Sequence, residues 1–78
     1  MYLDKVEYQL EEKMGDGSWS RVYQTKEEAY PSDEPRYVFF HTADEAREYV
    51  GASGRWSADA LARKVVQLIE VRTIIRPV

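Results

Sequence analysis

The sequence predicts an α+β fold with two layers, in which an antiparallel sheet of three to four strands carries one or two helices on one face. Three patterns predict it. Apolar and polar residues alternate over residues 2–14, which is typical of a strand with one buried face. A helix-start pattern begins at Thr42, and a β-branched segment covers residues 66–75. The length of 78 residues fits one domain, which we expect to span residues 1–78.

The first two strands are expected to form a hairpin. The segment Gly15-Asp16-Gly17 interrupts the alternation, and its two glycines accept positive φ at little cost, which favours a tight turn. The second strand covers residues 18–25, but its buried face stays open because Trp19 and Tyr23 alternate with Val22. In the first strand, the predicted buried face holds the even-numbered residues Tyr2, Val6, Tyr8, Leu10 and Met14.

The next segment, residues 26–36, is predicted to be an acidic surface loop because Pro31 and Pro35 prevent a continuous helix. Residues 26–30 are long enough for a single helical turn. A loop of about eleven residues is long for a small domain, and long loops are often functional. Residues 37–40 are continuously apolar and aromatic, which favours a short strand.

The helix that follows is predicted from its first turn. Thr42 and Glu45 have the spacing of a capping box, in which Glu45 reaches back to the Thr42 amide. Apolar residues then recur on one helical face as far as Val50. Gly51 or Gly54 is expected to end this helix.

A second, short helix is predicted after Ser57, which is a favourable N-cap. Its expected apolar stripe consists of Ala58, Leu61, Ala62 and Val65. Residues 61–67 fit both a helix and a strand, and we favour a strand from about Val66 because Val, Ile and Thr dominate after it. The last strand is expected beside the first, which brings the two chain ends near each other.

The composition excludes several kinds of site. The chain has no Cys, so it has no disulfide, no thiolate zinc site and no thiol nucleophile, and its single His excludes a two-His metal site. Leu, Ile, Val and Phe number 17 of 78 residues, which predicts a thin core supplemented by aromatic residues. No apolar run reaches the length of a membrane span, and no signal-peptide pattern begins the chain. We therefore expect a soluble, cytoplasmic domain without membrane contact.

Charge is unevenly distributed along the chain. Residues 1–50 carry a balance of −6 and residues 51–78 a balance of +3. This layout can steer a partner or hold a dimer together, although a solvated surface of mixed charge is the interpretation we favour. The late basic residues offer an alternative nucleic-acid site, at Arg55, Arg63, Lys64, Arg72 and Arg76.

The sequence shows no assembled catalytic site. His41 stands at a strand-to-helix junction, where we expect a surface or capping residue. The acid pairs are adjacent in sequence and are expected to be solvated. Residues 51–54 lack the context of a phosphate-binding loop and are interpreted as a connector. We therefore expect no catalytic residue, no metal and no cofactor.

The aromatic residues have two interpretations. Tyr and Trp are enriched at interfaces because each joins an apolar body to a polar edge. We favour core packing for most of them, and the alternative is a platform on one sheet face where nucleobases stack, formed by Tyr2, Tyr8, Trp19, Tyr23 and Tyr37. Trp19 and Trp56 adjoin turns, and Tyr30 lies between acids and a proline, so these three are the expected exposed anchors.

Three motifs occur in order: the turn Gly15-Asp16-Gly17-Ser18-Trp19, the helix start Phe40-His41-Thr42-Ala43-Asp44-Glu45-Ala46, and a C-terminal strand. This layout resembles that of small accessory proteins encoded by bacteriophages and prophages. The resemblance spans most of the chain and carries no catalytic residue across. It implies a protein that binds and inhibits host machinery, such as a restriction or CRISPR complex, in the bacterial cytoplasm.

The functional hypothesis is a non-enzymatic protein-binding module, with a host protein or complex as its partner. Its expected contact residues combine aromatic anchors with an acidic rim, at Trp19, Glu27, Glu28, Tyr30, Asp33, Glu34 and Trp56. The acidic loop suits a basic, nucleic-acid-binding surface on such a partner. Nucleic-acid binding by the basic residues near the C-terminus is the alternative. Pairing of the last strand across a two-fold axis, as a homodimer, is a third hypothesis.

Overall fold

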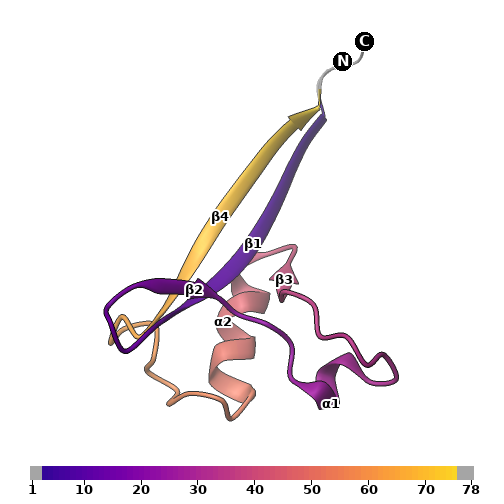
Figure 1. Ribbon diagram of the computed structural model, residues 1–78. Coiled ribbons are helices and arrows are strands. Elements are labelled where there is room, and N and C mark those ends of the chain that lie inside the picture. The colour runs from indigo at the N-terminus through magenta and orange to yellow at the C-terminus, as the bar shows by residue number, and fades with distance from the viewer. Residues whose placement is uncertain (1–2, 76–78) are drawn as a thin grey trace.

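The computed structural model describes residues 3–75, so Tyr2 and Arg76 lie outside the described residues. It confirms the predicted α+β class, with a four-stranded antiparallel sheet and two helices (Figure 1). The elements in chain order are β1 (Leu3–Lys13), β2 (Trp19–Arg21), α1 (Lys26–Ala29), β3 (Phe39–Phe40), α2 (Ala43–Ala52) and β4 (Val66–Ile75).

Strand β1 is the centre of the sheet. Strand β4 lies along one side of it, from Leu3 opposite Ile75 to Glu12 opposite Val66. The other side is shared by β2, which pairs with residues 11–13, and β3, which pairs with residues 8 and 9. The last strand therefore lies beside the first, as predicted.

Beyond β3, the two long strands continue alone. Residues 3–7 of β1 and residues 71–75 of β4 pair only with each other among the described residues, and we call them the arm. Figure 1 shows this ribbon projecting from the rest of the molecule, which we call the body. Because Leu3 pairs with Ile75 at the tip, the two ends of the described chain meet there, as predicted.

The core lies between the sheet and α2, which packs against β1 and β3 (Figure 1). Its buried side chains are Leu10, Val22, Val38, Ala46, Val50, Ala60 and Val66. Around them pack the half-buried residues Tyr8, Phe40, Tyr49, Trp56, Leu61 and Leu68. The aliphatic residues are few, and aromatic rings complete the core, as the composition predicts.

The β1–β2 hairpin is confirmed. The Met14 amide donates to the Ser18 carbonyl at 2.7 Å, and the Gly17 amide donates to the Met14 carbonyl at 2.9 Å. Gly17 adopts a φ of +88°, which a residue with a side chain rarely tolerates. The Asp16 carboxylate accepts from both the backbone amide and the hydroxyl of Ser18, which fixes the turn. Met14 belongs to this turn and is exposed, so its predicted place on the buried face is wrong.

Both helices begin at a threonine cap. The Thr42 hydroxyl accepts from the Glu45 amide at 3.1 Å, but the Glu45 carboxylate accepts from that hydroxyl and not from the Thr42 amide. The cap is confirmed and only half of the predicted box forms. A complete capping box stands instead at Thr25 and Glu28, where α1 supplies the predicted helical turn. Helix α2 continues through Gly51, and the positive φ of Gly54 follows its C-cap.

The predicted second helix after Ser57 is wrong, because residues 58–65 form consecutive turns. Lys64 adopts a φ of +58°, which reverses the chain ahead of β4 and is incompatible with a continuing helix. The Val65 amide donates to the Ala60 carbonyl at 3.1 Å. Ala60 is the residue that enters the core, whereas Ala58, Ala62 and Val65 of the predicted stripe are exposed. The predicted strand start at Val66 is confirmed.

Candidate interaction surface

The sheet has an outer face that neither of the described helices covers. Residues opposite each other in an antiparallel pair share a face, and β1 points Leu10 into the core. Gln9 and Glu11 therefore point outward, and so do their partners Phe39 and Arg21. Val22 and Val38 are buried, so the residues that alternate with them, which include the bridge pair Tyr23 and Tyr37, also point outward.

Four aromatic side chains are exposed on this face, at 36% for Trp19, 49% for Tyr23, 40% for Tyr37 and 53% for Phe39. The rings of Tyr23 and Tyr37 stack with their centroids 4.2 Å apart. The Arg21 guanidinium lies 4.3 Å from the centroid of Tyr37, a cation–π contact. We call these five residues the aromatic face.

This placement shows which aromatic residues pack in the core and which are exposed. Tyr8 packs against the core, as we favoured, but Trp19, Tyr23 and Tyr37 lie outside it. The physical reason is that Val22 and Val38 fill the inner face between them, which forces their neighbours outward. The buried face of the second strand, left open by the sequence, is therefore the Val22 face.

Polar side chains continue the outer face along β1. Glu7 lies 3.9 Å from the Arg21 guanidinium and accepts from the side-chain Nε2 of Gln9 at 2.9 Å. Gln67 donates to Glu11 at 2.6 Å across the β1–β4 pair. Charged groups of both signs thus border the aromatic residues, which matches the mixed surface that we expected.

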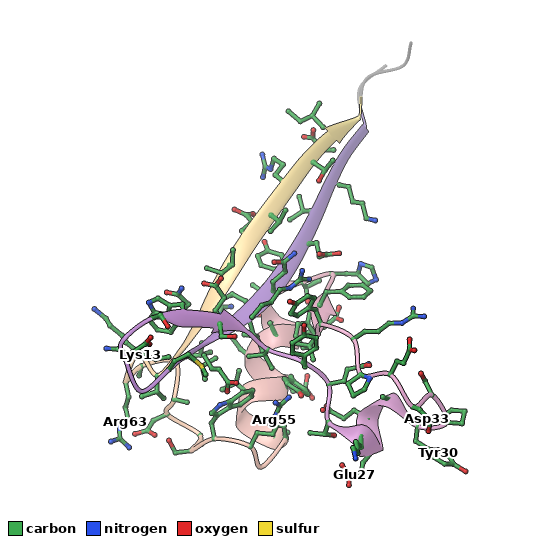
Figure 2. All side chains as sticks on the ribbon, in the orientation of Figure 1. Lys13, Glu27, Tyr30, Asp33, Arg55 and Arg63 are labelled. Carbon is green, nitrogen blue, oxygen red and sulfur yellow. The ribbon has the colours of Figure 1, made fainter. Side chains whose placement is uncertain are left out.

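The acidic segment, residues 26–36, adjoins this face. Figure 2 shows Glu27, Tyr30 and Asp33 together at one extremity of the body. The side chains of Glu27, Asp33 and Glu34 are exposed, and Tyr30 is 82% exposed, as predicted. A hollow of about 430 Å³ separates this segment from β3, lined by Gln24, Glu28, Arg36, Tyr37, Val38, Phe39, Phe40 and Tyr49. The hollow could receive a partner side chain between the acidic segment and the aromatic face.

Glu28 has a structural role that the sequence analysis did not predict. Its carboxylate accepts from the Thr25 amide at 2.8 Å and from the Tyr49 hydroxyl at 3.0 Å, and it lies 3.7 Å from Arg55. Burial alone would raise its pKa, but the hydrogen bonds from Thr25 and Tyr49, with the Arg55 charge, lower the pKa of Glu28 below its ordinary value. Glu28 therefore ties α1 to the body and is less available to a partner than Glu27.

Arg55 completes this attachment. Its guanidinium donates to the Tyr23 carbonyl at 2.6 Å and to the Tyr49 hydroxyl at 3.0 Å, and it lies 4.9 Å from the Trp56 ring centroid. We call Glu28, Tyr49 and Arg55 the Arg55 network. It joins the segment before α1, helix α2 and the loop after α2, and it fixes the backbone behind Tyr23.

Trp56 is not the exposed anchor that we predicted. It is half-buried, packs against the core and meets Tyr49 edge-on at 6.2 Å. Its indole N–H donates to Glu12 at 3.3 Å. The turn-adjacent position suggested exposure, but the thin aliphatic core leaves room that this large ring fills.

The basic residues of the alternative site do not gather. Arg55 is half-buried in its network, and Arg63 and Lys64 are exposed on the turns before β4. Arg72 lies on the arm, about 20 Å further along β4 at the rise of a strand. In Figure 2, Arg63 lies at the opposite side of the body from Asp33. The described basic residues therefore form no continuous stripe.

His41 is exposed at the junction of β3 and α2, with its ring edge-on to Phe39 at 6.0 Å between centroids. Within residues 3–75, no three acidic or His side chains cluster as metal ligands would. Neither of the two described helices has the length and apolar character needed to cross a membrane. No family model, curated protein or solved structure matches the chain.

Sequence reasoning missed Arg21 and Phe39 as surface residues and misplaced Tyr23 and Tyr37. The sequence did contain a signal for these residues, in the way that they alternate with two valines. Arg21 and Tyr23 flank Val22, while Tyr37 and Phe39 flank Val38, so two short segments share the same alternation. Pairing those segments through their valines places all four flanking side chains on one outer face.

Proposed function

We propose that this chain is a non-enzymatic protein-binding module that contacts its partner through the aromatic face. The observation that carries the proposal is the exposed, stacked arrangement of Tyr23 and Tyr37 beside Phe39. Such side chains supply large contact area, and Tyr is among the residues that dominate binding energy at interfaces. Because stacking and the Arg21 contact already restrict these rings, binding costs less side-chain entropy.

The acidic segment sets orientation in this proposal. Glu27, Asp33 and Glu34 are exposed on the segment whose Glu28 and Arg36 line the hollow, and they face no cation in the described structure at ion-pair distance. Charges at the rim of an interface raise the association rate with a partner of opposite charge. The proposed partner surface is therefore basic. The resemblance to phage accessory proteins suggests a host complex that binds nucleic acid in the bacterial cytoplasm, which we propose as the partner class.

The test compares capture of a partner by two matched variants. The double variant Tyr37→Ala and Phe39→Ala removes two anchors, and Met14→Ala removes an exposed apolar side chain in the hairpin turn. We expect the double variant to lose at least about tenfold in affinity for the protein that the wild-type chain captures, as hot-spot residues do. Met14→Ala should bind normally. Both should keep the wild-type circular dichroism spectrum. Normal binding by the folded double variant would refute the proposal.

The acidic rim has a separate test. Reversing the charge at Glu27, Asp33 and Glu34 should slow association and reduce its dependence on salt, with little change in dissociation. Glu28 is left unchanged because it belongs to the Arg55 network. Association kinetics measured at two salt concentrations check this expectation. An unchanged association rate would remove the acidic segment from the interface.

Single-stranded nucleic acid is a second candidate partner for the same face. The specific observation in its favour is the Tyr23–Tyr37 stack, which a base can extend at its exposed Tyr23 end, since the Tyr37 ring is covered by Tyr23 and by Arg21. Glu7 beside Arg21 and the net charge of −3 oppose phosphate contacts. Fluorescence anisotropy with labelled oligonucleotides at low and high salt separates the candidates. Binding at low salt that Tyr37→Ala abolishes would favour nucleic acid.

A further inference from the structure

Strand β4 presents a long edge with no strand on its outer side among residues 3–75. The backbone shows which groups face outward. The Lys13 amide donates to the Val65 carbonyl, and Leu10 accepts from Val22 on the opposite side of β1. Odd-numbered residues of β4 therefore bond to β1, and the backbone groups of even-numbered residues point outward, at Leu68, Glu70, Arg72 and Ile74.

This edge has little of the usual protection against pairing. Proteins guard exposed edges with charged side chains, Pro, bulges or very short strands, and β4 runs for ten residues without Lys, Pro or Gly. Its two charged side chains, Glu70 and Arg72, have opposite signs and so do not repel a second copy in every register. Its arm portion bears the exposed Ile74, which is 54% accessible, and the half-buried Val71. A ribbon of two strands is marginal in water without further support. The arm therefore has an unpaired edge and apolar side chains that another strand would cover.

We propose that β4 pairs with β4 of a second copy, antiparallel about a two-fold axis that passes between the two Val71 residues. The outward backbone groups require even-numbered residues to pair with even-numbered ones, so the axis must pass through a residue position. An axis at Glu70 sets two Glu70 carboxylates directly opposite, and an axis at Arg72 sets two guanidinium groups opposite. Like charges directly opposite destabilise a strand pair.

An axis at Val71 gives the register in which opposite charges face each other. Each Glu70 then stands opposite Arg72 of the other copy. The two-fold axis produces two such Glu70–Arg72 pairs, both at hydrogen-bonded positions. Within one chain these two side chains lie 3.9 Å apart on the same face, and Glu70 also accepts from the Tyr8 hydroxyl of β1 at 3.2 Å, so in the dimer Arg72 would exchange or share its partner Glu70 with that of the second copy. An axis at Ile69 also avoids like charges, but it sets Leu68 opposite Glu70 and pairs only residues 66–72. The Val71 register pairs residues 67–75.

The same register also covers the exposed side chain of Ile74. It sets Ile74 of one arm opposite Leu68 of the other copy, where the body begins. There, a hollow of about 400 Å³ is lined by Trp19, Leu61, Lys64, Val66, Gln67 and Leu68. Each arm thus lies along the body of its partner copy, and the two β4 strands together form roughly eight backbone hydrogen bonds. Of the aromatic face, Trp19 lines this hollow, whereas Tyr23, Tyr37 and Phe39 lie on the other side of β1 and stay open in the dimer.

The first test is a charge exchange followed by analytical ultracentrifugation. The wild-type chain should sediment as a dimer of the 9.1 kDa chain. Arg72→Glu alone, or Glu70→Arg alone, sets like charges opposite at two positions and should weaken dimerisation by about tenfold or more. A mixture of the two single variants should form a heterodimer as strong as the wild type, and so should the double exchange in one chain. A wild-type chain that stays monomeric at high micromolar concentration would overturn the proposal.

The second test fixes the register. The chain has no Cys, so a single introduced thiol can only link two copies. Val71→Cys places the two thiols at the axis, opposite each other in a non-hydrogen-bonded pair whose spacing suits a disulfide. It should cross-link under mild oxidation, whereas the matched variants Ile69→Cys and Thr73→Cys on the same face should not. Preferred cross-linking at Ile69→Cys would contradict the register. Because Tyr37 and Phe39, the residues changed in the partner-capture test, are not in the dimer contact, partner capture can fail or succeed independently of both tests.

Discussion

The arm and the body are built from the same two strands, and they differ in what covers them. In the body, Leu10 stands opposite Leu68 on the face that α2 packs against, and Leu10 is fully buried. Four residues along β1, Val6 stands opposite Arg72 on the same face, beyond the reach of α2, and it is only half-buried. A continuous alternation therefore fixes the direction of each side chain, and the neighbouring elements decide whether that direction leads into a core.

The difference also concerns backbone pairing. In the body, β1 has strands on both sides, whereas in the arm it has β4 alone. Local stability follows buried apolar area and the number of paired neighbours, so the arm should be the region of lower stability in an isolated chain. A second copy that pairs with β4 would reduce this difference.

The largest expected effect is on the free energy of unfolding, for which one substitution in the body is compared with one in the arm. Leu10→Ala removes a fully buried side chain and should lower the free energy of unfolding by about 2–5 kcal/mol, a large share of what a small domain has. Val6→Ala, on the same face of the same strand, should cost about 1 kcal/mol or less because the side chain is half-buried. Urea unfolding at one fixed protein concentration measures both. Equal costs would show that the arm is packed as firmly as the body.

The long strands β1 and β4 and the Thr42 cap were predictable from local sequence, whereas β2 and β3 are shorter than the predicted strands over residues 18–25 and 37–40. The alternation from residue 2 predicted β1, and the β-branched run predicted a strand from Val66. Thr42 predicted the start of α2. These elements are governed by residues close together in the chain, so a single-sequence pattern carries their signal.

The errors arose where distant segments meet. The positive φ of Lys64 has no local signature, because Gly or Asn normally occupies such a position, and so residues 58–65 resembled a helix. The aromatic face depends on pairing between Val22 and Val38, and the Arg55 network joins residues up to 32 positions apart. The exposure of Tyr30 on the acidic segment was predictable from composition, but the placement of Tyr37 and Phe39 required the sheet.

An intermediate effect on the free energy of unfolding is expected from the Arg55 network, which attaches α1 to the body. Tyr49→Phe removes the hydroxyl that donates to Glu28 and accepts from Arg55, and it should cost about 1–2 kcal/mol of unfolding free energy. The matched control Arg47→Met removes the Arg47–Asp44 ion pair, which is shorter at 2.9 Å but exposed, and should cost about 0.5 kcal/mol or less. Urea unfolding compares the two. If Arg47→Met cost more, burial would not explain what holds the body together.

The smallest expected effect is the pH dependence of stability. It compares the arm with the body at Tyr8, next to the residue where the arm begins. There, partial burial, followed by the charge and hydrogen bond of Glu70, raises the pKa of Tyr8 above its ordinary value of 10.0. A group whose pKa is raised in the folded state stabilises the fold below its unfolded pKa, and this contribution disappears as the pH rises through the folded value. The urea midpoint should therefore decline above about pH 10, where Tyr23 and Tyr49, whose pKa values are also raised, add to the effect.

At the acidic end the sign is opposite. The lowered pKa of Glu28 gives stability that is present above its ordinary value of 4.5 and is lost as the pH falls below it. Two variants separate the regions. Tyr8→Phe should reduce the alkaline decline and leave the acidic one unchanged, because it acts at the boundary of the arm. Glu28→Gln should reduce only the acidic decline, because it acts at the far side of the body. Urea midpoints measured from pH 3 to pH 11 check both, and a variant that altered both limbs equally would mean that the two regions unfold through shared contacts that this structure does not contain.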